Sequence, residues 1–251
     1  MKWIFVLVIC SGLNFDTLAQ DVNVIIKDAE RLELVPDEKA AFIKFKEALN
    51  LSPQNIFVLN KCSELCSRIG NREANTKNRD AYYNAAVLYG KKALAINPEN
   101  DEANVALAMA IGRTVLVKSG NEKISAVKDI RRYADKALKI NPQNFKAWHV
   151  LGKWNYEVSN LNFVEKAAIK VMYGGLPDAS FKKAILAYEE ANAIRPNFML
   201  NYLELAKAYK KNDERQKAIV QLKYLVKLNI QTEDDPRIKA EALNLIKTWE
   251  K

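Results

Sequence analysis

His149 and the three cysteines are the residues of this chain best suited to nucleophilic or metal chemistry. Because His149 is the only histidine, a multi-histidine metal site is excluded, and a Ser–His or Cys–His pair would have to use this single ring. No acidic partner can be assigned to it, and no paired carboxylates, metal-ligand cluster or glycine-rich phosphate loop stands out. We therefore expect no catalytic residues, no metal and no cofactor, and a protein that is not an enzyme.

The elements that must position these side chains are expected to be helices. The 251 residues are 49% hydrophobic, which is enough for a sizeable core, and include only 8 glycines. That glycine share is well below the usual ~7%, which disfavours barrels, propellers and other folds with many glycine turns. Abundant Ala, Leu, Lys and Glu favour helix.

A repeated string predicts how these helices are organised. Similar sequences occupy residues 48–55, 93–100, 137–144 and 191–198. Each string joins a helical apolar pattern with small residues to a proline, and the prolines are Pro53, Pro98, Pro142 and Pro196. Proline ends the helix before it and suits the opening of the next one.

The spacing of the prolines indicates lengthened tetratricopeptide repeats. The prolines lie 45, 44 and 54 residues apart, whereas this helix–turn–helix repeat has about 34 residues. We expect the extra residues, about 11, 10 and 20, between the two helices of three repeats. Stacked pairs bury an apolar face that one pair cannot bury alone. The sequence thus predicts an all-α, tetratricopeptide-like α-solenoid, a right-handed superhelix of four to five antiparallel helix pairs; a plain helical bundle is the alternative.

The chain is expected to divide into a leader and one domain. Residues 1–20 have the layout of a secretory signal peptide: a basic start, an apolar run over residues 3–10, and a cut after Ala19. Lipoprotein anchoring through Cys10 is a second interpretation, although Ile9 is large for the preceding position, and a buried N-terminal strand is a third. Residues 21–251 are predicted to form a single repeat domain, with 233–251 as a C-terminal capping helix. The predicted localisation is periplasmic or secreted.

The repeat frame also predicts the surroundings of the cysteines in the body. Cys62 and Cys66 lie four residues apart and take the Leu and Tyr positions of the repeat signature. Both are expected to be buried free thiols, with a disulfide bridge as the alternative in an oxidising compartment. Trp154 and Phe163 are likewise expected to pack and not to bind a ligand.

Residues 148–198 carry a more specific pattern. It comprises Leu151-Gly152-Lys153-Trp154, the pair Glu165-Lys166, the turn Leu176-Pro177, and Ala184, Tyr188, Ala191 and Pro196. This pattern resembles the regulator of microtubule dynamics protein family, and the likeness extends loosely over residues 22–230. The resemblance implies tetratricopeptide-like repeats with a lengthened repeat at this place. Animal members associate with microtubules or organelle membranes inside cells, but the export signal argues against microtubules here and leaves protein or lipid binding.

The first helix of each pair is expected to line a concave groove. By spacing, the groove residues are Asn60, Glu64, Val105, Met109, Arg113, Lys146, His149, Lys153, Tyr156, Leu203, Lys207 and Lys210. Several are basic and alternate with apolar or aromatic residues, which suits an acidic extended peptide or a lipid headgroup phosphate. The alternative is a solvated face with scattered lysines.

The longest insert is a second candidate site. Apolar residues recur at helical spacing from Leu161 to Met172, and the glycines at 174 and 175 then interrupt the pattern. The candidate residues are Phe163, Val164, Lys166, Lys170 and Met172. They could form a lid or a short amphipathic helix that touches a membrane. The favoured interpretation is an extra helix packed against the stack.

The predicted function follows from these surfaces. The 39 basic residues exceed the 30 acidic ones, but the two kinds are mixed along the helices, which argues against nucleic acid as a partner. We expect a non-enzymatic binding scaffold that engages a protein or peptide through the groove. The alternative is a carrier or sensor of an amphipathic ligand such as a phospholipid, which a continuous apolar cavity under residues 161–177 would favour.

Overall fold

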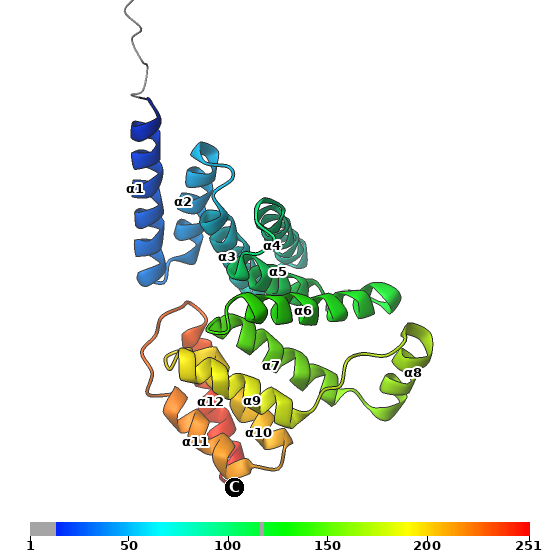
Figure 1. Cartoon of the computed structure of the whole chain (residues 1–251). Coiled ribbons are helices and arrows are strands. Elements are labelled where there is room, and N and C mark those ends of the chain that lie inside the picture. The colour runs from blue at the N-terminus through cyan, green and yellow to red at the C-terminus, as the bar shows by residue number, and fades with distance from the viewer. Residues whose placement is uncertain (1–13, 116–117) are drawn as a thin grey trace, which may run out of the picture.

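Within residues 14–115 and 118–251, which the computed structural model describes, the chain is an array of α-helices (Figure 1). They are α1 Asn14–Leu34, α2 Glu38–Leu51, α3 Ile56–Arg72, α4 Thr76–Ile96, α5 Asp101–Thr114, α6 Gly120–Ile140, α7 Phe145–Asn160, α8 Phe163–Tyr173, α9 Phe181–Ile194, α10 Met199–Lys211, α11 Arg215–Leu225 and α12 Asp235–Trp249. Cys10 and most of the predicted signal peptide lie outside the described residues, and residues 14–20 belong to α1. None of the described helices is long and apolar enough to cross a membrane.

The helices stack as consecutive pairs, as Figure 1 shows from the blue to the red end of the chain. α1 packs against α2, α3 against α4, α5 against α6, α7 against α9 and α10 against α11. Neighbouring pairs also touch through their first helices, since α3 contacts α5 and α5 contacts α7, while α12 covers α10 and α11. The predicted all-α, tetratricopeptide-like array is thus confirmed, with five pairs in the described part of the chain.

An asparagine two residues after the proline builds three of the turns between pairs. Asn55, Asn100 and Asn144 are the N-caps of α3, α5 and α7, and each side chain accepts from the backbone N–H of the third helical residue. Asparagine is among the best N-cap residues because it satisfies a donor that the helix leaves free. The prolines therefore precede the caps, which corrects the expectation that they open the next helices. In the fourth turn Phe198 stands at the cap position, and α10 has no side-chain cap.

The extra residues of the lengthened repeats are placed differently from the prediction. α4 begins at Thr76, close behind the end of α3 at Arg72, and both α4 and α6 are 21 residues long. In these two repeats much of the extra length therefore extends the second helix, where each added residue gains a backbone hydrogen bond. Among the described residues, a separate element, α8, lies between the two helices only in the repeat of α7 and α9.

Small residues allow the helices to approach closely, as the repeated string predicts. Ala48, Ala93, Ala137 and Ala191 are all 0% exposed. Trp154 is also buried, and its indole N–H donates to the carbonyl of Val127 at 2.8 Å. Packing, and not ligand binding, therefore accounts for this tryptophan.

The two cysteines of α3 are buried free thiols, as expected. Burial raises the pKa of both thiols, and that of Cys66 rises to about 12. We expect alkylation of the folded protein at pH 8 to be about a thousandfold slower at these positions than for an exposed cysteine, because the thiolate is the nucleophile. Peptide mass spectrometry after iodoacetamide treatment, with and without urea, measures this; rapid labelling of the native chain would contradict the buried placement.

Candidate binding face

The first helices of the pairs share a surface with α12 that we call the inner face. α3, α5, α7 and α10 contribute its rows of polar side chains, and α12 lies against its C-terminal end. Its buried polar residues include Asn60, Glu64, His149, Asn201 and Glu204. Buried polar groups need partners, so the contacts among these side chains determine what the face offers to a ligand.

A partly buried lysine links three repeats on this face. Lys146 of α7 contacts Glu64 of α3 at 2.5 Å and Glu102 of α5 at 2.8 Å. Burial alone would raise the pKa of Glu64, but the Lys146 ammonium holds that pKa below its usual value. Burial likewise opposes the charge on Lys146, whose pKa the two carboxylates nevertheless raise. This lysine is therefore a charged tie between helices.

A second buried carboxylate holds the C-terminal half together. Glu204 of α10 accepts from Lys153 of α7 at 2.8 Å and lies 3.4 Å from Lys207. Lys207 also pairs with Glu241 of α12 at 2.8 Å. Although burial would raise the pKa of Glu204, Lys153 and Lys207 hold it below its usual value. Lys153 also pairs with Glu157 at 2.9 Å. Charges of both signs thus alternate across this part of the face.

His149 is a structural side chain. The side-chain amide of Asn201 donates one hydrogen to the carbonyl of Tyr188 and the other to the side chain of Asn192, each at 2.7 Å. The side-chain oxygen of Asn201 therefore accepts from Nδ1–H of His149, at 2.8 Å. Burial lowers the pKa of His149, and its ring packs against Phe198 with the centroids 4.9 Å apart. The neutral imidazole is therefore fixed inside the stack.

The inner face is closed by a contact between the two ends of the array, which we call the clasp. Arg72 at the end of α3 contacts Glu38 at 2.6 Å, Asp234 at 3.1 Å and Glu233 at 3.2 Å. The backbone N–H of Glu38 also donates to Glu233 at 2.7 Å. The segment before α12 thus meets α2 and α3, close to Arg113, whose pKa is lowered by burial.

The structure places the other predicted groove residues as follows. Two of them form hydrogen bonds within the stack: Asn60 donates to Asn100 at 3.2 Å, and Arg113 donates to Asn71 at 3.1 Å. Tyr156 packs on Phe181, and Met109 is partly buried. Lys210 is exposed. Val105 and Leu203 belong to the hydrophobic core and do not face a groove.

The predicted basic character of the groove needs correction. Lys146, Lys153 and Lys207 are each paired with acidic side chains, so the face carries mixed charges. Glu204 could have been anticipated, because it lies one helical turn before Lys207. The clasp was missed because its partners are 162 residues apart along the chain, and no local pattern reports such a contact.

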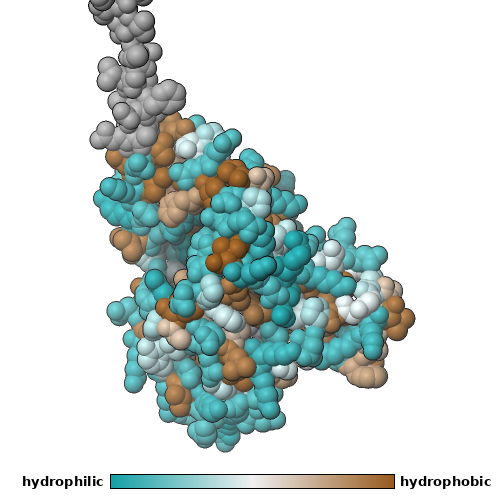
Figure 2. Space-filling view, in the orientation of Figure 1, coloured by the Kyte–Doolittle hydropathy of each residue, from teal (hydrophilic) through white to brown (hydrophobic). Residues whose placement is uncertain are grey.

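The insert helix α8 forms as predicted, but it touches the stack at α6 without burying its residues there. None of its residues is buried, and Phe163 is 85% exposed, which corrects the expectation that it packs. Val164 and Met172 are exposed as well, as are Lys166 and Lys170. Figures 1 and 2 show this helix on a lobe that projects from the body, with apolar residues at its outer edge.

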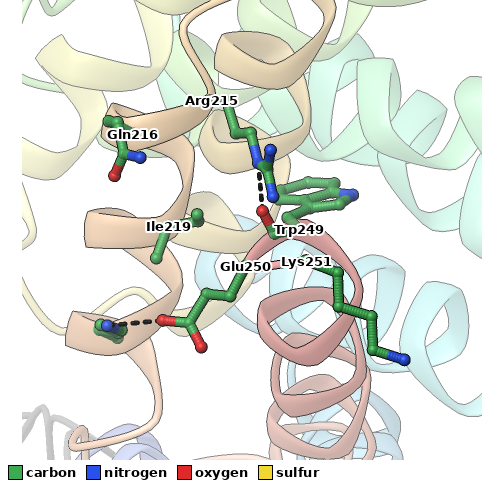
Figure 3. A pocket seen from close by; sticks show the side chains of 7 residues that line it. Arg215, Gln216, Ile219, Trp249, Glu250 and Lys251 are labelled. Atoms are coloured by element: carbon green, nitrogen blue, oxygen red, sulfur yellow. Dashed lines mark hydrogen bonds and ion pairs between the residues drawn. The ribbon is translucent and has the colours of Figure 1, made fainter.

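A pocket lies at the C-terminal end, between α11 and α12 (Figure 3). Its lining residues are Arg215, Gln216, Ile219, Lys223, Trp249, Glu250 and Lys251. Arg215 donates to the carbonyl of Trp249, and Lys223 pairs with Glu250 at 2.7 Å. These contacts anchor the end of α12.

A second pocket is lined by Lys46, Leu49, Asn50, Pro53, Leu59, Tyr89 and Lys92.

Comparison with solved structures shows the fold. A tetratricopeptide-repeat protein of Thermus thermophilus superposes with a TM-score of 0.66 at 16% identity, covering 89% of this chain and 99% of that one. The type IV pilus biogenesis factor PilW has a TM-score of 0.56 at 18% identity, covering 92% of this chain and 91% of that one.

Comparison of sequences shows the family. Regulator of microtubule dynamics protein 1 of Bos taurus is 28% identical over 163 residues, which are 64% of this chain and 51% of that protein. Regulator of microtubule dynamics protein 2 of Homo sapiens is 24% identical over 234 residues, which are 91% of this chain and 55% of that protein. The chain thus spans about half the length of the curated relatives it matches. The family model "Regulator of microtubule dynamics protein 1-3" matches residues 25–250, and the chain therefore belongs to this family.

Proposed function

We propose that the chain is a non-enzymatic binding scaffold of the periplasm or cell exterior, which engages a protein or peptide partner through the inner face. The observation that carries the proposal is the row of half-exposed charges where α7, α10 and α12 meet. The side chains of Lys153, Glu157 and Arg237 are 44%, 59% and 58% exposed, and Lys210, one turn after Lys207 on α10, is exposed as well. Lys153 is held by the buried Glu204 and Arg237 by the largely buried Asp234, and both side chains remain open to a ligand.

The chemistry of the row favours a partner that carries both signs of charge. Glu204 is already neutralised by Lys153 and Lys207, so a purely acidic peptide would gain little from these lysines. An extended segment with alternating charges would instead add partners to Lys210, Glu157 and Arg237 without breaking the buried pairs. Complementary charges of this kind mainly contribute specificity and association rate.

The partner proposed here differs from the one in the relatives' names. Those proteins are named as regulators of microtubule dynamics. The signal-peptide pattern of residues 1–20 is the reason for proposing an exported partner instead. A phospholipid carrier would need an apolar cavity beneath residues 161–177, whereas the pocket between α11 and α12 and the pocket beside Lys46 lie elsewhere.

Photo-crosslinking in cells tests the scaffold proposal. A benzoylphenylalanine at position 210 on α10 is expected to trap the partner, whereas the same group at Lys139, exposed on the second helix α6, is expected to trap none. Because these charges lie at the rim of the contact, Lys210→Glu combined with Arg237→Glu should weaken capture by about tenfold. The trapped scaffold should begin at Gln20 if it is exported.

The matched control is Lys139→Glu, which should leave capture unchanged. Helicity of each variant is checked by circular dichroism, since all three substituted side chains are largely exposed. Equal adduct yields from positions 210 and 139 would refute recognition by the inner face. An N-terminus that still begins at Met1 would refute the exported location while leaving the binding face to be judged by the adducts.

A further inference from the structure

The helix α8 turns its apolar side away from the protein. The residues of this side are Phe163, Val164, Ala167, Ala168, Val171 and Met172, and all six are exposed. On a helical wheel of 3.6 residues per turn they form one continuous face. Phe163 and Val171 are 85% and 86% exposed. A surface helix normally buries its apolar stripe against the core, so this arrangement is reversed.

The reversed orientation is built into the segment. Asn162 and Glu165 form a capping box at its start, and Gly174 ends the helix in the left-handed conformation with φ 71°. Ile169 and Tyr173, on the opposite side, are partly buried. The Lys128 ammonium of α6 donates to the carbonyl of Tyr173 at 2.9 Å, and α8 contacts α6. The side that carries Ile169 and Tyr173 is therefore the one that faces the body.

The size of this face argues against a second copy of the chain as its occupant. A stable interface between proteins needs about 800 Å² and roughly 20–30 residues from each partner. The apolar side of α8 has six residues on a helix of eleven, on a projecting lobe (Figure 2). A lipid bilayer does not need a complementary pocket, because insertion depends on apolar area and on attraction to anionic headgroups.

The charges beside the apolar face point to an anionic bilayer. Lys166 and Lys170 lie one turn apart along one edge of it and are both exposed. Long lysine side chains at such an edge keep their ammonium groups among headgroups while their stems cover apolar surface. Glu165, near the other edge, is engaged by the backbone N–H of Asn162 at 2.8 Å. We propose that α8 docks on the surface of a membrane rich in anionic lipid, with Phe163, Val164, Val171 and Met172 inserted. This inference is independent of the inner face and goes beyond the scaffold function.

A local fluorescent probe tests the proposal, because residues 3–10 could bind vesicles by themselves. An environment-sensitive nitrobenzoxadiazole group is attached to a cysteine introduced as Val171→Cys in the full chain, which also carries Cys10→Ser. The control carries the same group at Val220→Cys on α11, where the native side chain is 60% exposed. Adding vesicles of phosphatidylcholine and phosphatidylglycerol in equal parts should shift the emission to the blue at position 171 and leave position 220 unchanged. Pure phosphatidylcholine should require about tenfold more lipid for the same shift.

Two variants separate the apolar from the electrostatic contribution. Phe163→Ser with Met172→Ser is expected to abolish the shift, and Lys166→Glu with Lys170→Glu should raise the lipid concentration required by about tenfold or more. Leu186→Ser, at a side chain 62% exposed on α9, is the matched control and should change nothing. No shift at position 171 with anionic vesicles would overturn the proposal. A dimer in sedimentation velocity that Phe163→Ser dissociates would also overturn it and assign the face to a second copy.

Discussion

Replacing Gly152 by alanine is expected to lower the free energy of unfolding by about 2–3 kcal/mol, although alanine favours helix by about 1 kcal/mol. A Cβ atom at this position would lie 2.6 Å from Cδ1 and 2.7 Å from Cε1 of Tyr188. The ring cannot withdraw easily, because Tyr188 is 0% exposed and packs against His149. Urea unfolding followed by circular dichroism measures the change.

Gly112→Ala is the matched control for this substitution. The nearest atom to a Cβ at Gly112, which also lies in the first helix of a pair, is Cδ1 of Ile130 at 3.9 Å, an ordinary contact. This variant should therefore be more stable than the parent by about 0.5–1 kcal/mol, the gain in helix propensity. If the two variants had effects of the same sign and size, the close approach of α7 and α9 would be refuted.

Arg72→Met is expected to cost about 2–3 kcal/mol, because it leaves the carboxylate of Glu38 buried with one of its two cationic partners removed. The Glu38 side chain is 2% exposed and retains only Arg68, whose Nε lies 3.2 Å away. The same substitution releases Glu233 and Asp234, so the segment before α12 loses its contact with α3. The loss of stability is measured by urea unfolding.

Two further variants decide whether the clasp causes this loss. Arg132→Met breaks an exposed pair with Asp129, so its effect should stay within about 0.5 kcal/mol. Adding Glu38→Gln to Arg72→Met removes the stranded charge, so the double variant should be less destabilised than the sum of the single ones. Strict additivity would show that Arg72 and Glu38 do not act together.

The helical array could be predicted because the signals that end and cap helices act within a few residues of the chain. The prolines predicted the helix ends, whereas the asparagine caps two residues later were not predicted; both effects are complete within one turn. The small residues at Ala48, Ala93, Ala137 and Ala191 predicted close helix contacts for the same reason. The period of the prolines then indicated how many pairs the chain contains.

The sequence could not show in which direction a helix face points. The apolar spacing of residues 163–172 is the spacing of a core-facing helix, yet the structure turns that side outward. The contact of Tyr173 with Lys128 of α6 sets this orientation, and it depends on how two separate segments meet. Spacing determined that Phe163 lies on the apolar face of this helix but not which way that face points. The prediction that Phe163 packs was therefore wrong.

The charges of the inner face were predictable only in part. Spacing placed Glu64, Lys146 and Lys153 on one surface, but repeats one or two apart supply their partners. Whether a lysine attracts a ligand or ties two helices together depends on those distant partners. The predicted basic groove became a face of mixed charge for this reason.

The closure of the inner face by the clasp is tested most directly by a distance between spin labels. Labels on Ala74→Cys, in the turn after α3, and Ala240→Cys, on α12, are both at exposed positions, and the buried Cys62 and Cys66 need not be removed. With Cys10→Ser as background, double electron–electron resonance should give one narrow distribution centred on the separation in the structure, and Arg72→Met should broaden it. A broad distribution in the parent chain, unchanged by Arg72→Met, would contradict the closed inner face.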